Sequence, residues 1–142
     1  MNTRPSKIVC VGRSYAEHAQ ELGNAIPDSP VLFIKPPSSL ISLEDGITWN
    51  KNLGNLHHEC ELTLRLDQPL KNETDPQKAL EAIGAVTLGL DLTLRDLQDS
   101  LKKKGHPWER SKAFDGACVL ADWVEVSEVK AWNAVTFDFQ VN

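Results

Sequence analysis

Two glutamates separated by one residue stand in the stretch NLHHECELTLRL, residues 55 to 66. The even-numbered residues of this stretch are mostly apolar, whereas the odd-numbered residues include His57, Glu59 and Glu61. Successive side chains of a β-strand point to opposite faces, so the pattern predicts a half-buried strand with both glutamates on one face. Two carboxylates so close repel each other, and a divalent cation would relieve that repulsion. The spacing equally fits a polar face that is simply solvated.

A second stretch, AIGAVTLGLDLTLRDLQDSLKKKG, combines a strand with a helix. Residues 83–90 are almost wholly apolar, which predicts a strand covered on both sides, and Asp91 follows at its C-terminal end. Thr93 and Asp96 match a capping pattern for the helix that follows. Leucines at 94, 97 and 101 form its apolar stripe, and the lysine run at its end suits the helix dipole.

The N-terminal part predicts a short strand at 7–12 and a helix at about 14–23. Ser14 can cap this helix and Gly23 can end it. On the helix, His18 and Glu21 are three residues apart and share a face, where the simplest interpretation is a surface pair. The segment PVLFIKPP predicts another strand. It ends at the two prolines, because proline cannot continue the hydrogen-bonded ladder.

The bulk composition excludes several classes of protein. The chain has 142 residues and a formal net charge of −5, with scattered Lys and Arg, which argues against nucleic acid or an anionic membrane as partner. No apolar run approaches the roughly 18 residues of a membrane span, and no signal peptide is evident. Three widely spaced cysteines argue against a disulfide framework and favour a cytoplasmic location. The final residues, AVTFDFQVN, predict a strand that the chain end interrupts, so we expect a C-terminal truncation.

Five blocks together resemble the fumarylacetoacetate hydrolase family, in its small acylpyruvase and oxaloacetate decarboxylase branch. They are IVCVGRSYAEHAQEL, PVLFIKP, NLHHECEL, LDLTLRDLQ and KKKGHPWERSKAFDGAC, in that order. The resemblance implies an α+β, mainly β fold, a mixed β-roll that is incomplete here. It also implies a single partial catalytic domain over residues 1–142, with a lid helix at about 14–23. The family's later T-G-T-P-x-G-V-G motif is not in this chain.

The resemblance further implies a metal site. Family members bind Mg²⁺ or Mn²⁺ through positions that match Glu59, Glu61 and Asp91, and three carboxylates form the hard oxygen site that these ions prefer. His57 and His58 are interpreted as structural or supporting residues and not as ligands, because the metal prefers oxygen.

The matching positions also imply roles around the metal. Arg95 and Gln98 would bind substrate, and Lys112 would both bind substrate and stabilise negative charge during catalysis. His18, held by Glu21, would act as the catalytic base. Judged without the family, Arg95 and Gln98 are exposed polar residues of a helix.

The function that follows is divalent-metal-dependent cleavage of the C3–C4 bond of small 2-oxo acids, by acylpyruvate hydrolysis or oxaloacetate decarboxylation. The alternatives are an enol–keto isomerase of related 2-oxo diacids, a silent metal-binding fragment, a half that needs a complementing chain, and a scaffold without metal. The expected partners are a small 2-oxo acid and, for the full-length protein, a second copy in a homodimer, with neither nucleic acid nor membrane.

Overall fold

The computed structural model describes residues 4–14 and 27–141. The described chain is built mainly from β-strands, with two α-helices and several short 3₁₀ turns. The strands are β1 (Ile8–Gly12), β2 (Val31–Lys35), β3 (Leu40–Ser42), β4 (Leu56–Leu66), β5 (Ile83–Leu94), β6 (Cys118–Leu120) and β7 (Val124–Glu125). The helices are α2 (Pro76–Glu81) and α3 (Arg95–Lys103). This secondary structure agrees with the predicted fold class, which is α+β and mainly β.

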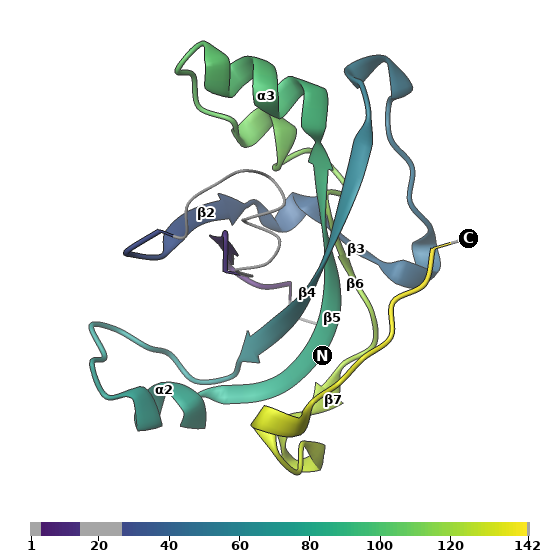
Figure 1. The fold of residues 1–142 in the computed structure, drawn as a ribbon. Coiled ribbons are helices and arrows are strands. Elements are labelled where there is room, and N and C mark those ends of the chain that lie inside the picture. The colour runs from purple at the N-terminus through teal and green to yellow at the C-terminus, as the bar shows by residue number, and fades with distance from the viewer. Residues whose placement is uncertain (1–3, 15–26, 142) are drawn as a thin grey trace.

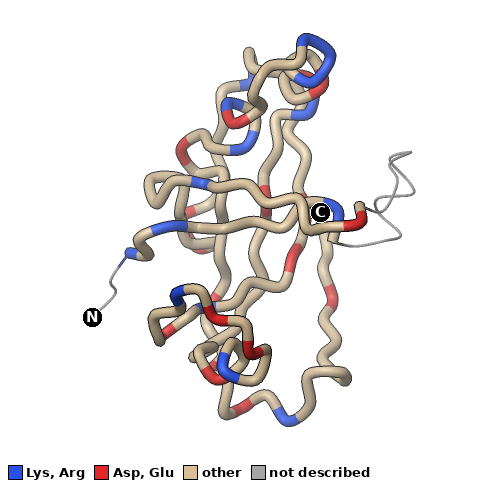
Figure 2. The backbone as a smooth tube through the Cα atoms, turned by 90° about the vertical axis from the view of Figure 1, so that its left-hand side faces the viewer, with Lys and Arg blue, Asp and Glu red and all other residues tan. Residues whose placement is uncertain are grey.

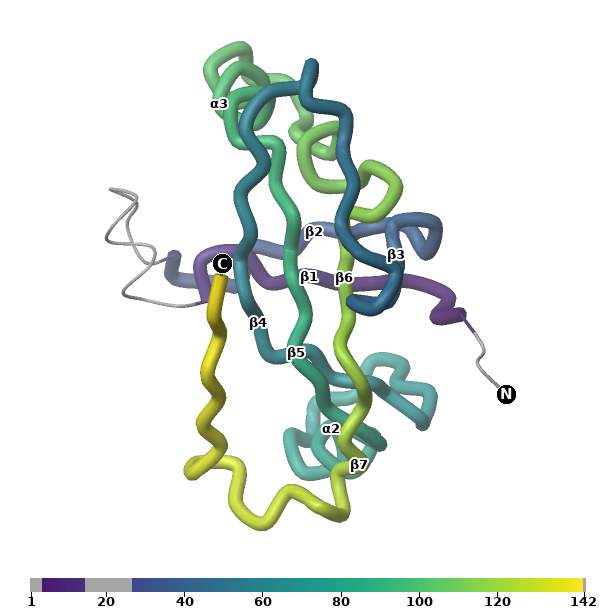
Figure 3. Tube along the Cα trace, turned by 90° about the vertical axis from the view of Figure 1, so that its right-hand side faces the viewer, coloured from purple at the N-terminus to yellow at the C-terminus, as the bar shows by residue number. Residues whose placement is uncertain are grey.

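The strands form two sheets that cross each other. The larger has the order β3-β6-β5-β4, with β7 paired to one end of β5, and it mixes one parallel pair with antiparallel pairs. The smaller is the antiparallel pair β1–β2. Figure 3 shows β4, β5 and β6 side by side, with the β1–β2 pair running across them. Figure 1 shows this pair on the concave side of the long, curved β4 and β5.

Strand β5 is the centre of the larger sheet. It pairs with β4 over its whole length and with β6 and β7 on its other edge, and nearly all of its side chains are buried. The prediction of a strand covered on both sides is therefore confirmed. Its end was predicted too early, because the strand continues to Leu94 and Asp91 lies inside it. The β4 ladder holds these last residues in extended backbone.

The interpretation of the glutamate face of β4 as a solvated face is wrong, because that face is half-buried and the leucine face is exposed. Leu62, Leu64 and Leu66 are 39%, 44% and 55% exposed, whereas Glu59 and Glu61 on the other face are half-buried. The reason is the position of the β1–β2 pair, which lies over the polar face and not over the leucine face. The polar side of this strand therefore faces the interior.

The predicted cap of α3 is wrong. Leu94 is the N-cap residue and no side chain caps the helix. Thr93 is still part of β5, and its hydroxyl donates to the Asp91 carbonyl at 3.4 Å. The Asp96 carboxylate accepts from the backbone N–H of Asn55 at 3.0 Å, and so ties α3 to the segment before β4.

The strand predicted at the end of the chain is also absent from the described residues. Residues 135–141 have no strand partner and stay irregular. Phe137 and Phe139 are about half exposed, although the Phe139 ring lies 5.6 Å from the imidazole of His58. An alternating pattern forms a strand only where a second strand supplies hydrogen bonds.

Acidic and basic residues are interspersed along the backbone, as Figure 2 shows. Lys and Arg are thus scattered along the described part of the chain, as they are in the sequence. None of its helices has both the length and the apolar character needed to span a bilayer.

Candidate metal centre

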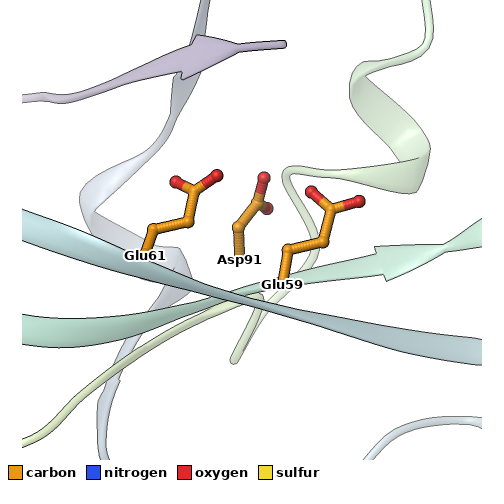
Figure 4. A group of neighbouring side chains, drawn as sticks. All are labelled: Glu59, Glu61 and Asp91. Carbon is orange, nitrogen blue, oxygen red and sulfur yellow. The ribbon is translucent and has the colours of Figure 1, made fainter. Parts of the chain in front are cut away.

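Glu59, Glu61 and Asp91 come together on the inner face of the larger sheet. Each offers a carboxylate oxygen, and the three oxygens lie within 4.8 Å of one another. The register explains the cluster, because Glu59 is directly opposite Asp91 and Glu61 is opposite Gly89. Figure 4 shows the three carboxylates rising from β4 and β5 on the same side. The three predicted ligands are thus neighbours, although Asp91 follows Glu61 by thirty residues in the sequence.

Three cationic side chains surround these carboxylates. The Lys112 ammonium donates to Glu59 Oε2 at 2.8 Å and to Asp91 Oδ2 at 2.5 Å. Arg95 donates to Glu59 Oε1 at 2.5 Å. Lys35 lies 2.7 Å from Asp91 Oδ1, but its hydrogen bonds go to the backbone carbonyls of Leu92 and Lys112.

Both lysines are almost fully buried, at 1% exposure for Lys35 and 4% for Lys112. A buried ammonium is unfavourable unless it is paired, and here the Asp91 carboxylate supplies that pairing. Lys112 follows a 3₁₀ turn at Glu109–Ser111 and lies outside the regular strands and helices.

The two glutamates have opposite electrostatic environments. Burial raises the pKa of Glu59, but the charges and hydrogen bonds of Lys112 and Arg95 prevail and lower it below its ordinary value. Burial together with the negative charges of Asp91 and Glu59 raises the pKa of Glu61 to about 7. No hydrogen bond or ion pair joins Glu61 to another described residue. Among the three carboxylates, Glu61 is therefore the one that no described cation contacts.

The donor set fits a hard divalent cation. The ligands are three carboxylates, the group that Mg²⁺ and Mn²⁺ prefer. The buried Asp91 Oδ1 accepts no hydrogen bond from the described residues, although the Lys35 ammonium lies 2.7 Å from it, and Glu61 forms an ion pair with none of them. A divalent cation held by Glu59, Glu61 and Asp91 would satisfy both groups. Three carboxylates and three cations balance, so the added ion would make the centre positive and favour an anionic ligand.

The predicted substrate residues lie beside the cluster. Gln98 is buried, and its side-chain oxygen accepts from Arg95 at 2.6 Å. Arg95 also lies 3.4 Å from Nδ1 of His57, whereas His58 faces the opposite side of β4 toward Phe139. Neither histidine belongs to the carboxylate cluster. Arg95 therefore links Glu59 to Gln98, and the interpretation of both as merely exposed helix residues is wrong.

A small cavity of about 80 Å³ lies next to Glu61, between β1 and the larger sheet. Its lining includes Glu61, Asp91, Cys10 and Cys118. Burial raises the pKa of the Cys10 thiol to about 12 and that of Cys118 to about 11. A raised pKa favours the protonated, unreactive thiol near neutral pH, so both cysteines act as small apolar residues of the cavity wall.

Sequence reasoning missed Lys35, whose ammonium lies 2.7 Å from Asp91, against 2.5 Å for the predicted Lys112. The available signal was its position, since a lysine ends the apolar run VLFI just before two prolines. His18 and Glu21, the predicted catalytic base and its partner, lie outside the described residues, as does most of the predicted lid helix. Their roles stay predictions.

Comparison with known proteins gives close relatives. An oxaloacetate tautomerase of Escherichia coli, YcgM, is 43% identical over 123 residues, which are 87% of this chain and 56% of the relative. A mitochondrial oxaloacetate decarboxylase of Dictyostelium discoideum is 38% identical over 130 residues, 91% of this chain and 59% of the relative. The chain thus spans a little over half the length of these relatives.

Solved structures agree with this fold. A fumarylacetoacetate hydrolase family protein from Yersinia pestis superposes with a TM-score of 0.87 at 40% identity, over 92% of this chain and 60% of that one. A fumarylpyruvate hydrolase from Pseudomonas aeruginosa, solved with Mn²⁺ and pyruvate, gives 0.71 at 30% identity, over 87% and 55%. Residues 7–142 match the model of the fumarylacetoacetate hydrolase C-terminal domain. The chain therefore belongs to the fumarylacetoacetate hydrolase family.

Proposed function

We propose that this chain carries the metal centre of an enzyme that acts on small 2-oxo acids through an enolate. The observation that carries the proposal is the convergence of three carboxylates with the buried ammonium of Lys112. In this proposal Glu59, Glu61 and Asp91 hold Mg²⁺ or Mn²⁺. The bound ion would supply Lewis acidity that favours negative charge on the oxygen of a 2-oxo group.

We propose that Lys112 and Arg95 position the substrate and stabilise its negative charge. Lys112 is fixed between Glu59 and Asp91, so its ammonium is held where negative charge develops on the substrate oxygen. Arg95 is oriented by Glu59 and Gln98, and its guanidinium can bind a substrate carboxylate. Both cations lie in a largely buried site, where an electrostatic interaction is stronger than in water.

Oxaloacetate is the substrate that the relatives favour. The names of two relatives specify an oxaloacetate tautomerase and an oxaloacetate decarboxylase. In decarboxylation the C3–C4 bond breaks, CO₂ leaves, and the electron pair stays as the enolate of pyruvate, which takes a proton at C3. In tautomerisation a proton moves between C3 and the oxygen on C2. His18 with Glu21 is the proposed proton carrier for either reaction.

Hydrolysis of acylpyruvates is the second candidate. The fumarylpyruvate hydrolase that shares this fold was solved with Mn²⁺ and pyruvate, the expected fragment of such a cleavage. Hydrolysis requires a water molecule to attack the distal carbonyl before the C3–C4 bond breaks, and His18 would activate that water.

The proposal is tested by incubating the purified chain with Mn²⁺ and either oxaloacetate or acetylpyruvate. Loss of the enol absorbance and formation of pyruvate are followed separately, so that tautomerisation is distinguished from cleavage. Since free metal ions decarboxylate oxaloacetate, a blank without protein sets the baseline. We expect a rate above that baseline, which Glu59→Gln abolishes because it removes a carboxylate ligand.

Glu81→Gln is the matched control, because Glu81 is exposed at the end of α2, away from the carboxylate cluster. This variant should keep the wild-type rate. Equal rates in the blank, the wild type and Glu59→Gln, in protein shown to be folded, would overturn the proposed activity of this chain.

A further inference from the structure

Strand β2 holds Lys112 by residues of its inner face. Side chains alternate along the strand, so that Leu32 and Ile34 are exposed whereas Phe33 and Lys35 point toward the larger sheet. The buried ammonium of Lys35 donates a hydrogen bond to the backbone carbonyl of Lys112. This bond fixes the backbone of Lys112 but not its long side chain, which ends in the ammonium that the proposed function uses.

The Phe33 ring contacts both ends of the turn that carries Lys112. This turn begins at Trp108, the N-cap residue of the 3₁₀ helix Glu109–Ser111, and ends at Lys112. The rings of Phe33 and Trp108 pack edge to face, with centroids 5.1 Å apart and an angle of 66° between their planes. The Lys112 ammonium lies over the Phe33 ring, 5.3 Å from its centroid, which is within the range of a cation–π interaction.

The contact between Phe33 and Lys112 is independent of the proposed metal ligands. The Lys112 ammonium also donates to Glu59 and Asp91, but these two carboxylates belong to the set that would hold a divalent ion. An ammonium that shares carboxylates with a divalent ion is repelled by that ion, and a further stabilising contact then keeps it in place. The negative face of the Phe33 ring supplies such a contact without using a ligand oxygen.

We infer that Phe33 is a positioning residue, which holds the Lys112 ammonium toward the substrate oxygen through the face of its aromatic ring. The inference rests on the function proposed for Lys112. Removal of the ring should weaken the binding of a 2-oxo acid and leave the binding of the metal ion unchanged. A general loss of structure would instead weaken both.

The test compares Phe33→Leu and Phe33→Met, which keep an apolar side chain without an aromatic face, with Phe33→Tyr, which keeps the ring. Calorimetry measures the dissociation constants of Mn²⁺ and of pyruvate on the Mn²⁺-loaded chain, and urea unfolding verifies that each variant is folded. Phe33→Leu and Phe33→Met should weaken pyruvate binding about threefold to tenfold, the loss expected of one cation–π interaction, at an unchanged dissociation constant for Mn²⁺. Phe33→Tyr should retain the wild-type affinity for pyruvate.

A double-mutant cycle with Lys112→Met tests whether the ring acts through the ammonium. In the Lys112→Met background, Phe33→Leu should have no further effect on pyruvate binding, because no ammonium remains for the ring to hold. Ile34→Ala is the matched control, since Ile34 lies on the exposed face of the same strand, and this variant should leave both dissociation constants unchanged.

The outcomes separate the positioning role from the metal centre. Wild-type affinity for pyruvate in Phe33→Leu and Phe33→Met overturns the inference, as does a parallel loss of Mn²⁺ affinity or an equal effect of Phe33→Leu in the Lys112→Met background. A wild type that binds Mn²⁺ but not pyruvate overturns the inference and leaves the metal centre in place. A wild type that binds neither overturns the proposed function as well.

Discussion

Glu61 is the residue on which the metal-free centre depends most. Its neighbours Glu59 and Asp91 are held by lysine and arginine, whereas Glu61 has no such partner among the described residues. Burial and two negative neighbours therefore raise its pKa to about 7, against an ordinary value of 4.5. This carboxylate stays protonated in the folded chain at pH values where it is ionised in the unfolded chain.

The raised pKa predicts how stability depends on pH. The folded state binds a proton more tightly than the unfolded state, so this contribution to stability is complete below about pH 4.5 and is lost as the pH rises through about 7. In EDTA, the free energy of unfolding should therefore fall between pH 5 and pH 8. Saturating Mn²⁺ should remove the decline, because the ion replaces the proton on Glu61. Urea unfolding at several pH values measures both effects.

Glu61→Gln provides the control for this prediction, because a glutamine has no proton to lose. The metal-free variant should show a smaller decline in stability between pH 5 and pH 8 than the wild type. An equal decline in both proteins would assign the effect to another group.

At the level of the elements, the pairing of β4 with β5 creates the centre, and Gly89 permits it. Gly89 lies opposite Glu61 and beside the cavity. A Cβ at this position would lie 2.6 Å from Thr63 Oγ1 and 3.0 Å from a methyl group of Leu120. The neighbouring side chains would have to move to make room.

Gly89→Ala should therefore lower the free energy of unfolding by about 1–3 kcal/mol, the usual result of overpacking. It should also weaken Mn²⁺ binding, because Glu61 is the cross-strand neighbour of this residue. Urea unfolding and a Mn²⁺ titration measure the two effects. Adding Thr63→Ala removes the closest clash and should restore part of the stability. If the second substitution restores nothing, the clash with Thr63 is not the cause.

The strands β1, β2, β4 and β5 could be predicted from the sequence, but not which face of β4 is buried. Side chains alternate between the two faces of a strand, so the spacing of two residues between Glu59 and Glu61 places both on the same face. Burial of that face depends on β1 and β2, which come from an earlier part of the chain and cross it. No local pattern contains this information. Only the family resemblance led to the metal face, and its three ligand positions do lie together.

Lys35 illustrates a different limit. Its burial depends on Asp91 and on two backbone carbonyls, all more than fifty residues away in sequence. A lysine at the end of an apolar strand ordinarily extends its ammonium into solvent. The contacts of Arg95 were equally hidden from local reasoning, since helical spacing alone suits exposure to water.

For the molecule as a whole, the uncovered apolar surfaces are the main feature. The outer face of the β1–β2 pair presents Val9, Val11, Leu32 and Ile34, each between 41% and 61% exposed. A contiguous exposed patch of this kind is typical of a contact surface between chains. The predicted homodimer stays a prediction, as does the single domain over the whole chain.

Leu32→Lys combined with Ile34→Lys should reduce self-association, measured by sedimentation velocity over a range of protein concentrations. Because both side chains are more than half exposed, the free energy of unfolding should change by no more than about 0.5 kcal/mol. Thr74→Lys with Gln77→Lys adds the same charge at exposed positions near α2 and serves as the control. If this pair reduces association equally, charge is responsible and the apolar patch is not.

The pairing of Glu59 with Asp91 also bears on how the chain reaches its native alignment. A slip of β4 by one residue against β5 would turn both glutamates to the leucine side and leave Asp91 alone within the sheet. A divalent ion bound across the two strands would stabilise the native alignment over an alignment slipped by one residue. Metal binding would then favour the native register of β4 against β5 during folding, before the ion takes part in any reaction.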